Sequence, residues 1–416
     1  RLSMVRARLP NFRLPTTGPS SSDFLPLAEL NALDSDILAH ANLEQVLADS
    51  PSAPVPAWRG TYHQDSSGAT QHWLIDAQTG TILESESVAF DLVQVYERSP
   101  RDGKLINTNL EGLDDSGFLD GLKFHVLAPD ESAPRATTPF EYRPDDPEQS
   151  WAFDQVQVYY SANRVLQWLI QRFGYDTNKV SQILIRINEI INGSADNAQY
   201  VPPPQGPMIL IGRGGNVLTQ LARDSDVVTH EFMHHVIYDF VQSHRDESGI
   251  FHEGTADYFA YALNSDPNLA ESSVIAGGPL RTALLPDTAR FDSFALNRSL
   301  HVRGQVWSAM LWELRVQIGE SFDRTVYESL PYLGPNSGFR DAIIGLIHAD
   351  QALNAGVDRC RILEVAVRRG FALVLGELDG SSCGLDMREL ARESRANFDR
   401  LRPTTEEAKP TIEDSV

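Results

Sequence analysis

Residues 227–240 read VVTHEFMHHVIYDF, and this stretch carries the most informative pattern in the chain. Inside it, His230, Glu231 and His234 form the pattern H-E-x-x-H. A helix turns by about 100° per residue, so the two histidines would point from one face, one turn apart. Two such imidazoles can bind one cation, and Zn²⁺ is the usual one for nitrogen ligands. Glu231 would lie beside the cation, where a carboxylate can take a proton from water.

The alternative is a surface helix that happens to carry three histidines. A zinc hydrolase needs a third protein ligand and one position left for water. Glu253 is a candidate, because it begins a second helical pattern that could turn back against the first. Asp257 lies one turn further on the same face and could accept the free ring N–H of a ligand histidine. The two motifs together argue against a chance cluster and predict a metal site.

Composition limits the function classes. The chain has 416 residues, enough for two or three domains with their own cores. Its net charge of −22 argues against nucleic acid as a partner, since that needs a basic surface. The apolar runs are too short to cross a bilayer, so we expect no membrane partner. No signal peptide is visible; the protein is either cytosolic, or a targeting segment is missing from this sequence. We expect a monomer.

The two cysteines, Cys360 and Cys383, leave two interpretations open. They could form one disulfide, which would fit an oxidising compartment. They could equally remain two reduced, buried thiols.

Composition and periodicity divide the chain into segments. A helix is expected over residues 34–47, followed by short strands up to residue 83. Helical spacing is expected over residues 151–174, strands over 183–191 and 208–211, a polar turn over 194–200, and mostly helices after residue 250. The expected segments are a disordered leader (1–26), a small module (27–100), a linker with the first strands of the catalytic region (101–150), a lobe with the zinc helix (151–245), a helical lobe (246–402) and a disordered tail (403–416).

The stretch DVVTHEFMHH…ESGIFHEGTADYFA resembles the active-site core of the thermolysin and fungalysin metallopeptidases. The resemblance implies an α+β fold with a sheet-rich N-terminal lobe and a helical C-terminal lobe. It implies that His230, His234 and Glu253 bind zinc and that Glu231 is the general base. It also implies that Asp257 is the outer partner of a ligand histidine.

Other matches extend the resemblance. The segment ADNAQY carries the pair Asn197–Ala198, which lies in the family on the edge strand that receives the peptide. GGPLRTALLPD matches a segment whose arginine, here Arg281, contacts the substrate carbonyl. LHVRGQVWSAM matches the segment of a second catalytic histidine, here His301, which would stabilise the oxyanion. Three simpler interpretations remain open: a salt bridge for Arg281, an Asx turn for Asn197, and a helix start without substrate contact for His301. Of the neighbouring histidines, His235 is expected to be a packing or surface residue, and His244 and His252 either line the cleft or are exposed loop residues.

Two further features concern regulation and ions. The segment HWLIDAQTGTILESES, with the expected helix before it, resembles PepSY and FTP propeptide modules. The acidic residue that orients the second histidine in thermolysin has no close counterpart, since Asp292 is further from His301. Asp226 stands where thermolysin has a calcium ligand, but the acidic partners expected downstream are replaced. Calcium therefore remains possible, and we expect the double calcium site to be absent.

The sequence thus predicts a secreted zinc endopeptidase made as a proenzyme. Glu231 would pass the proton of the attacking water to the leaving amine, and His301 would stabilise the oxyanion. The partners would be polypeptide substrates and the protein's own propeptide, acting as an intramolecular inhibitor. The alternative is a weakly active or inactive zinc-bearing homologue that binds peptides or has a structural role. An aminopeptidase is less favoured, because no extra acidic motif could hold a free N-terminus.

Overall fold

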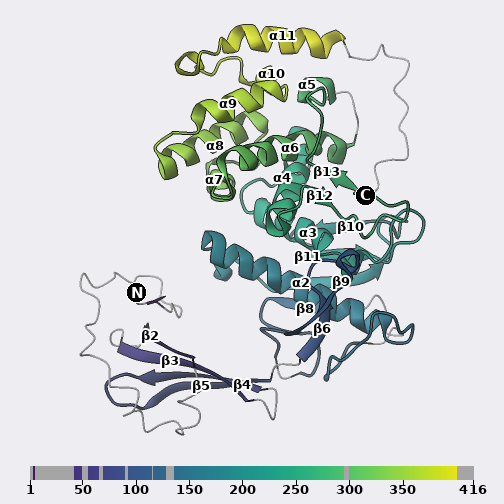
Figure 1. Ribbon diagram of the computed structural model, residues 1–416, viewed down its shortest axis with the longest axis vertical. Coiled ribbons are helices and arrows are strands. Elements are labelled where there is room, and N and C mark those ends of the chain that lie inside the picture. Colours follow the sequence, from purple (N-terminus) through teal and green to yellow (C-terminus); the bar gives the residue numbers. More distant parts are fainter. Residues whose placement is uncertain are drawn as a thin grey trace. The chain divides into compact units, whose positions relative to one another are not determined.

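The computed structural model describes residues 3–4, 42–48, 55–64, 69–89, 92–114, 116–127, 135–294 and 299–400. The chain divides into two compact units, one of Arg1–Leu92 with Asn109–Glu111 and one of Val93–Thr108 with Gly112–Val416. Helices and small sheets are mixed, which agrees with an α+β class (Figure 1). No described helix is long and apolar enough to cross a membrane.

The first unit contains a five-stranded sheet in the order β1-β2-β3-β4-β5. β1 pairs parallel to β2, and the other pairs are antiparallel. After β4, Asp76 closes a turn by accepting the N–H groups of Gln78 and Thr79, both at 2.8 Å. The strands are β1 (Ser3–Met4), β2 (Asn42–Ala48), β3 (Val55–Gln64), β4 (Ala69–Asp76) and β5 (Ile82–Ala89).

The helix predicted over residues 34–47 is wrong for its second half. Residues 42–47 form most of β2, which pairs with β3 along its whole length. Residues 34–41 lie outside the described part of the chain. A short apolar run fits both the helical and the strand period, and pairing with a neighbouring strand decides between them.

The second unit begins with a two-stranded sheet, β6 (Leu92–Tyr96) and β7 (Leu105–Asn109). Val93 and Val95 are buried, and the backbone N–H and C=O of Tyr96 both bond to the amide of Gln157 on helix α2 (Ser150–Phe173). These bonds hold the strand pair against α2. The second unit thus starts at Val93, and Asn109–Glu111, at and after the end of β7, are grouped with the first unit.

A four-stranded sheet in the order β10-β11-β9-β8 carries the edge strand β10. The strands are β8 (Phe124–Leu127), β9 (Ile183–Glu189), β10 (Ala198–Val201) and β11 (Met208–Gly212). β8, β9 and β11 are parallel, and β10 pairs antiparallel with β11. The polar turn expected over 194–200 is wrong for its last three residues, which join β10 because the ladder with β11 satisfies their backbone.

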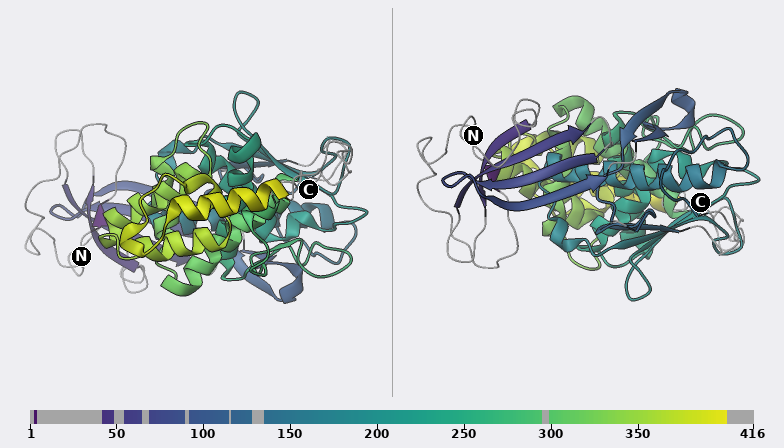
Figure 2. Two further views of the ribbon diagram at one scale, coloured as in Figure 1. Left: turned by 90° about the horizontal axis from the view of Figure 1, so that it is seen from above. Right: turned by 90° about the horizontal axis from the view of Figure 1, so that it is seen from below.

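Helices make up most of the remainder. They are α3 (Ser225–Tyr238), α4 (Asp246–Asn264), α5 (Phe291–Phe294), α6 (Leu300–Ile318), α7 (Phe322–Ser329), α8 (Phe339–Asn354), α9 (Arg359–Arg368), α10 (Ala372–Leu375) and α11 (Met387–Arg400). Two short strands, β12 (Asn268–Leu269) and β13 (Arg281–Thr282), pair after α4. α4 packs against both α3 and α6, while α8 to α11 lie together beyond them (Figures 1 and 2).

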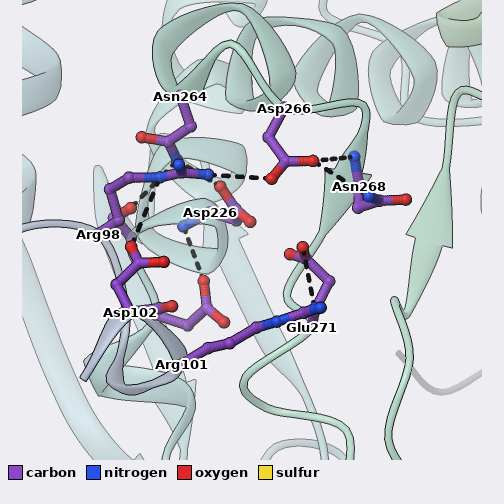
Figure 3. A pocket seen from close by; sticks show the side chains of 11 residues that line it. Arg98, Arg101, Asp102, Asp226, Asn264, Asp266, Asn268 and Glu271 are labelled. Carbon is purple, nitrogen blue, oxygen red and sulfur yellow. Dashed lines mark hydrogen bonds and ion pairs between the residues drawn. The ribbon is translucent and has the colours of Figure 1, made fainter.

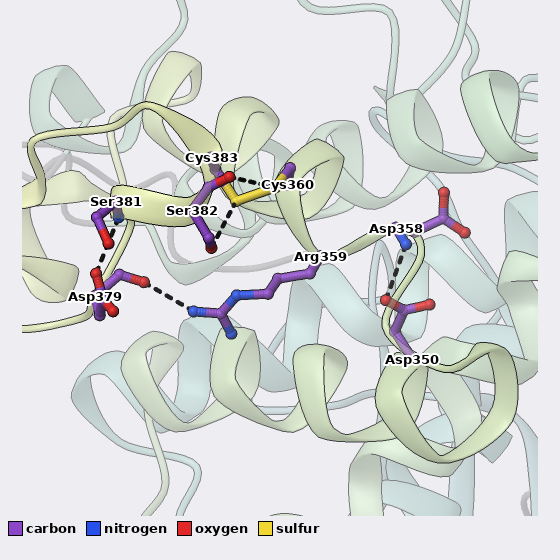
Figure 4. The surroundings of a disulfide bond; sticks show 8 residues. All are labelled: Asp350, Asp358, Arg359, Cys360, Asp379, Ser381, Ser382 and Cys383. Atoms are coloured by element: carbon purple, nitrogen blue, oxygen red, sulfur yellow. Dashed lines mark hydrogen bonds between the residues drawn. A yellow bond between two sulfur atoms is a disulfide. The ribbon is translucent and has the colours of Figure 1, made fainter.

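The two cysteines form a disulfide (Figure 4). Cys360 at the start of α9 is joined to Cys383 with an S–S distance of 2.08 Å. Beside it, the guanidinium of Arg359 donates to the backbone carbonyl of Asp379 at 2.8 Å. The bond therefore ties the segment after α10 back to α9, and the disulfide interpretation is the one that the structure shows.

Candidate metal centre

Helix α3 is the central element of the site. Asp224 caps its N-terminus by accepting the N–H of Asp226, and every residue from Ser225 to Ile237 is buried. A helix buried on all sides must pack against several elements, and α3 packs against α2, α4 and β10. Its histidines therefore face an interior that these neighbours build.

Three ligand atoms converge between α3 and α4. Nε2 of His230 lies 3.1 Å from Nε2 of His234 and 3.2 Å from Oε2 of Glu253. Nε2 of His234 lies 3.7 Å from Oε1 of Glu253. Ligand atoms at about 2.0–2.1 Å from a tetrahedral zinc ion would lie roughly 3.3 Å apart. The donor set and its spacing therefore fit such an ion.

Asp257 and Arg281 support His230 from behind. Oδ1 of Asp257 lies 2.8 Å from Nδ1 of His230. Arg281 donates hydrogen bonds from Nε and Nη2 to the same carboxylate, each at 2.9 Å. With the proton on Nδ1, the Nε2 lone pair of His230 is free for a cation. Burial lowers the pKa of His230, but Asp257 and Glu253 outweigh it and raise the pKa to about 10. These two carboxylates therefore favour a positive charge at His230.

Glu231 lies next to this cluster, in a cleft that brings the predicted substrate residues together. The lining includes Asn197, Ala198, His230, Glu231, Arg281 and His301. Burial raises the pKa of Glu231 to about 7, although the backbone N–H of Tyr200 on β10 bonds to it and opposes the shift. A base with a pKa near neutrality is suited to taking and returning a proton.

His301 reaches the site because α4 and α6 touch through glycines. A Cβ on Gly254 would lie 2.4 Å from the carbonyl oxygen of Gly304, so neither helix tolerates a side chain at the contact. One turn earlier on α6, Nε2 of His301 lies 3.2 Å from Oε2 of Glu253. Asp292 is bonded instead to Arg290, Ser394 and Asn397, so it is occupied elsewhere.

The remaining predicted residues are placed as follows. Arg281 lines the cleft, but its guanidinium is bound to Asp257, which is the salt bridge left open by the sequence. Ala198 begins the edge strand β10, and the carbonyl of Asn197 accepts the N–H of Gly212. His235, expected as a packing or surface residue, is buried and bonds to the Tyr200 hydroxyl at 3.0 Å.

Sequence reasoning left His252 as a cleft or exposed loop residue, and the structure corrects this. His252 is fully buried, and its Nδ1 lies 3.4 Å from Nδ1 of His234. Together with His244, these histidines form a second group of potential metal ligands. Only one signal was available beforehand, namely that His252 directly precedes Glu253.

A separate cavity of about 160 Å³ lies at the start of α3 (Figure 3). We call it the acidic pocket; its lining includes Asp102, Asp224, Asp226, Asp266 and Glu271, with Arg98, Arg101, Asn264 and Asn268. Arg98 pairs with Asp266 at 3.1 Å, and Arg101 pairs with Glu271 at 3.2 Å. Within the described part of the chain, the groups with metal-ligand spacing both contain His234, and neither lies in this pocket. Calcium binding here stays a prediction.

Comparisons with known proteins agree with this geometry in general terms. No protein family model matches the chain. Over 279 residues the chain is 23% identical to a protein named extracellular metalloproteinase MEP from Pyricularia oryzae. The match covers 53% of this chain and 44% of that protein, so the chain spans less than half the length of this relative. The similarity supports a metallopeptidase, and the histidine and glutamate cluster is compatible with a bound metal ion.

Proposed function

We propose that this chain is a zinc-dependent endopeptidase of the thermolysin and fungalysin type. The observation that carries the proposal is the convergence of His230, His234 and Glu253 beside Glu231, in a cleft that begins at an edge strand. Zinc bound there would supply a Lewis acid for the substrate carbonyl and the attacking water. Polypeptides are the substrates that an exposed strand edge suits.

The chain's own residues account for positioning and proton transfer. A peptide paired to β10 would lie along Asn197 and Ala198, next to Glu231. Glu231 takes the proton of the attacking water and returns it to the leaving amine, for which a pKa of about 7 is suited. His301, at the same cleft, donates toward the developing oxyanion. Asp257, held by Arg281, orients His230.

The proposal includes secretion as a proenzyme. The relative is named as extracellular, and the disulfide between Cys360 and Cys383 suits an oxidising compartment. Residues 1–92 of the first unit, with its five-stranded sheet, would be the propeptide and the intramolecular inhibitor. Because residues 93–108 belong to the second unit, we propose that the cleavage that removes the propeptide lies before residue 93.

The test is the substitution Glu231→Gln. It removes the base and leaves the ligands, so bound zinc should stay near one per chain while peptide cleavage falls by about 10²- to 10⁴-fold. His234→Ala should lose the metal. Metal content is measured by elemental analysis, and cleavage with a quenched peptide. Glu364→Gln on the exposed face of α9 is the matched control and should change neither quantity. Unchanged cleavage by Glu231→Gln would refute the mechanism.

A weakly active, peptide-binding homologue remains the alternative. It is favoured by one observation: in the described part of the chain, the ion contact of His301 is to the proposed ligand Glu253 rather than to a separate acidic residue. The two functions are separated by casein cleavage with and without a chelator. Peptide binding without chelator-sensitive cleavage, in a chain processed before residue 93, would favour the alternative.

A further inference from the structure

The two proposed ligand histidines are supported by different chemistry. His230 has a carboxylate behind it, since Nδ1 lies 2.8 Å from Asp257. Behind His234 there is instead another imidazole, with Nδ1 of His252 at 3.4 Å from Nδ1 of His234. The planes of these two rings are inclined by 32°, so an in-plane N–H of one ring can face an in-plane lone pair of the other.

The tautomer of His252 follows from its second contact. Nε2 of His252 lies 2.7 Å from the backbone carbonyl of Val241. A carbonyl only accepts hydrogen bonds, so Nε2 must carry a proton. In a neutral ring, Nδ1 of His252 is then an unprotonated acceptor.

The tautomer of His234 follows from the proposed function, on which this inference rests. If Nε2 of His234 binds the metal, its Nδ1 carries the proton and points at the acceptor of His252. The separation of 3.4 Å is long for a hydrogen bond, but the donor and acceptor roles match without any rearrangement.

We propose that His252 is a positioning residue that accepts the Nδ1–H of His234 and thereby fixes the orientation of that ligand for the metal. The resulting chain of hydrogen bonds runs from the Val241 carbonyl through both imidazoles to the metal position. It is fully buried at His252, where water cannot replace the acceptor. Outer partners of this kind typically change metal affinity by about 10- to 100-fold when removed.

His244 provides the matched comparison. Its ring lies against that of His252, with centroids 4.2 Å apart and planes inclined by 33°. Its Nε2 is buried without a hydrogen-bond partner among the residues that the structure describes. His244 therefore shares the packing of His252 without its place in the chain of hydrogen bonds.

The experiment compares the full-length protein with the variants His252→Leu, His252→Asn and His244→Leu. Leu and Asn both lose the bond to Val241, but Asn keeps an acceptor oxygen close to the position of Nδ1. Zinc affinity, from competition with a chelator, should fall about 10- to 100-fold in His252→Leu. It should be largely restored in His252→Asn and unchanged in His244→Leu. The visible spectrum of the Co²⁺ form should shift in His252→Leu alone.

Three results would overturn the proposal. These are an unchanged affinity in His252→Leu, an equal loss in His252→Asn, or an equal loss in His244→Leu, which would indicate packing or a three-histidine metal site. If His252→Leu does not fold, ¹H–¹⁵N correlation of histidine side chains in the zinc-loaded wild type decides. An Nε2–H tautomer of His252 supports the proposal, and an Nδ1–H tautomer overturns it. Absence of zinc binding by the wild type would instead refute the proposed function.

Discussion

The beginning and the middle of helix α3 both lie beside buried carboxylates, yet the partners of those carboxylates differ. In the acidic pocket, Asp226 bonds to the neutral amide of Asn264 and the N–H of Ala270, while Asp224 bonds to neutral serine hydroxyls. The two arginines of the pocket are paired instead with Asp266 and Glu271.

One turn further along, the carboxylates face arginine or histidine side chains. Asp257 meets Arg281 and His230, and Glu253 meets His301, His230 and His234. Burial raises the pKa of Asp224 to about 6, and burial with the neighbouring Asp224 raises the pKa of Asp226. Burial also acts to raise the pKa values of Asp257 and Glu253, but their basic partners outweigh burial, and both pKa values are lowered. Between Asp257 and the carboxylates of the acidic pocket, the cationic Arg281 therefore makes the difference, because it keeps a buried carboxylate ionised.

The largest effect is expected from Asp257→Asn. The variant replaces the charged partner of His230 by a neutral amide and leaves Arg281 buried without its counter-charge. Zinc affinity should fall about 10- to 100-fold. The free energy of unfolding should fall by about 3–5 kcal/mol, because a buried charge is left unpaired. Chelator competition and urea unfolding measure the two quantities.

The control for this variant is Asp323→Asn. Asp323 is also buried and paired with an arginine, Arg315, at 2.9 Å, but it is not among the proposed metal-site residues. It should lose stability and keep the wild-type zinc affinity. Equal losses of affinity in both variants would mean that Asp257 acts only through stability.

A smaller effect is expected from Asp226→Asn in the acidic pocket. A carboxyl whose pKa is raised by folding stabilises the folded state while it is protonated, and that stability is lost as pH rises through the folded-state pKa. Asn cannot ionise, so it escapes this loss. The unfolding free energy of the variant minus that of the wild type should therefore increase as the pH is raised from 4 to 8. One pKa unit corresponds to about 1.4 kcal/mol.

This difference is measured by urea unfolding at several pH values. Taking the difference from the wild type removes the titration of groups that do not interact with residue 226, whereas the neighbouring Asp224, which raises the pKa of Asp226, contributes to the difference. Parallel stability profiles for the two proteins would contradict the raised pKa of Asp226.

The smallest effect is expected at the rim of the same pocket. Arg101 pairs with Glu271, but its side chain is 59% exposed, so water and salt screen the pair. Arg101→Gln should reduce the unfolding free energy by about 0.5 kcal/mol or less at low salt. At high salt the difference should vanish. A loss that persists in high salt would show that Arg101 neutralises the pocket more strongly than its pairing indicates.

Several features were open to prediction because they depend on local spacing. Residues four apart on one helix share a face, which is why His230 with His234, and Glu253 with Asp257, could be paired from the sequence. The structure brings these four residues together with Glu231 and His301. The edge position of the strand after Asn197 also agrees with the expectation.

The sequence by itself thus determined the helical faces and the types of ligand, because both follow from residue identity and a fixed rise and turn per residue. Only the tertiary structure decided which distant partners complete those faces. It chose a strand for residues 42–47, engaged Arg281 with Asp257, placed His252 behind His234, and brought His301 to Glu253 through the contact of Gly254 with Gly304. The reason is physical: each of these outcomes depends on packing and hydrogen bonds between segments far apart in the chain, which no local period encodes.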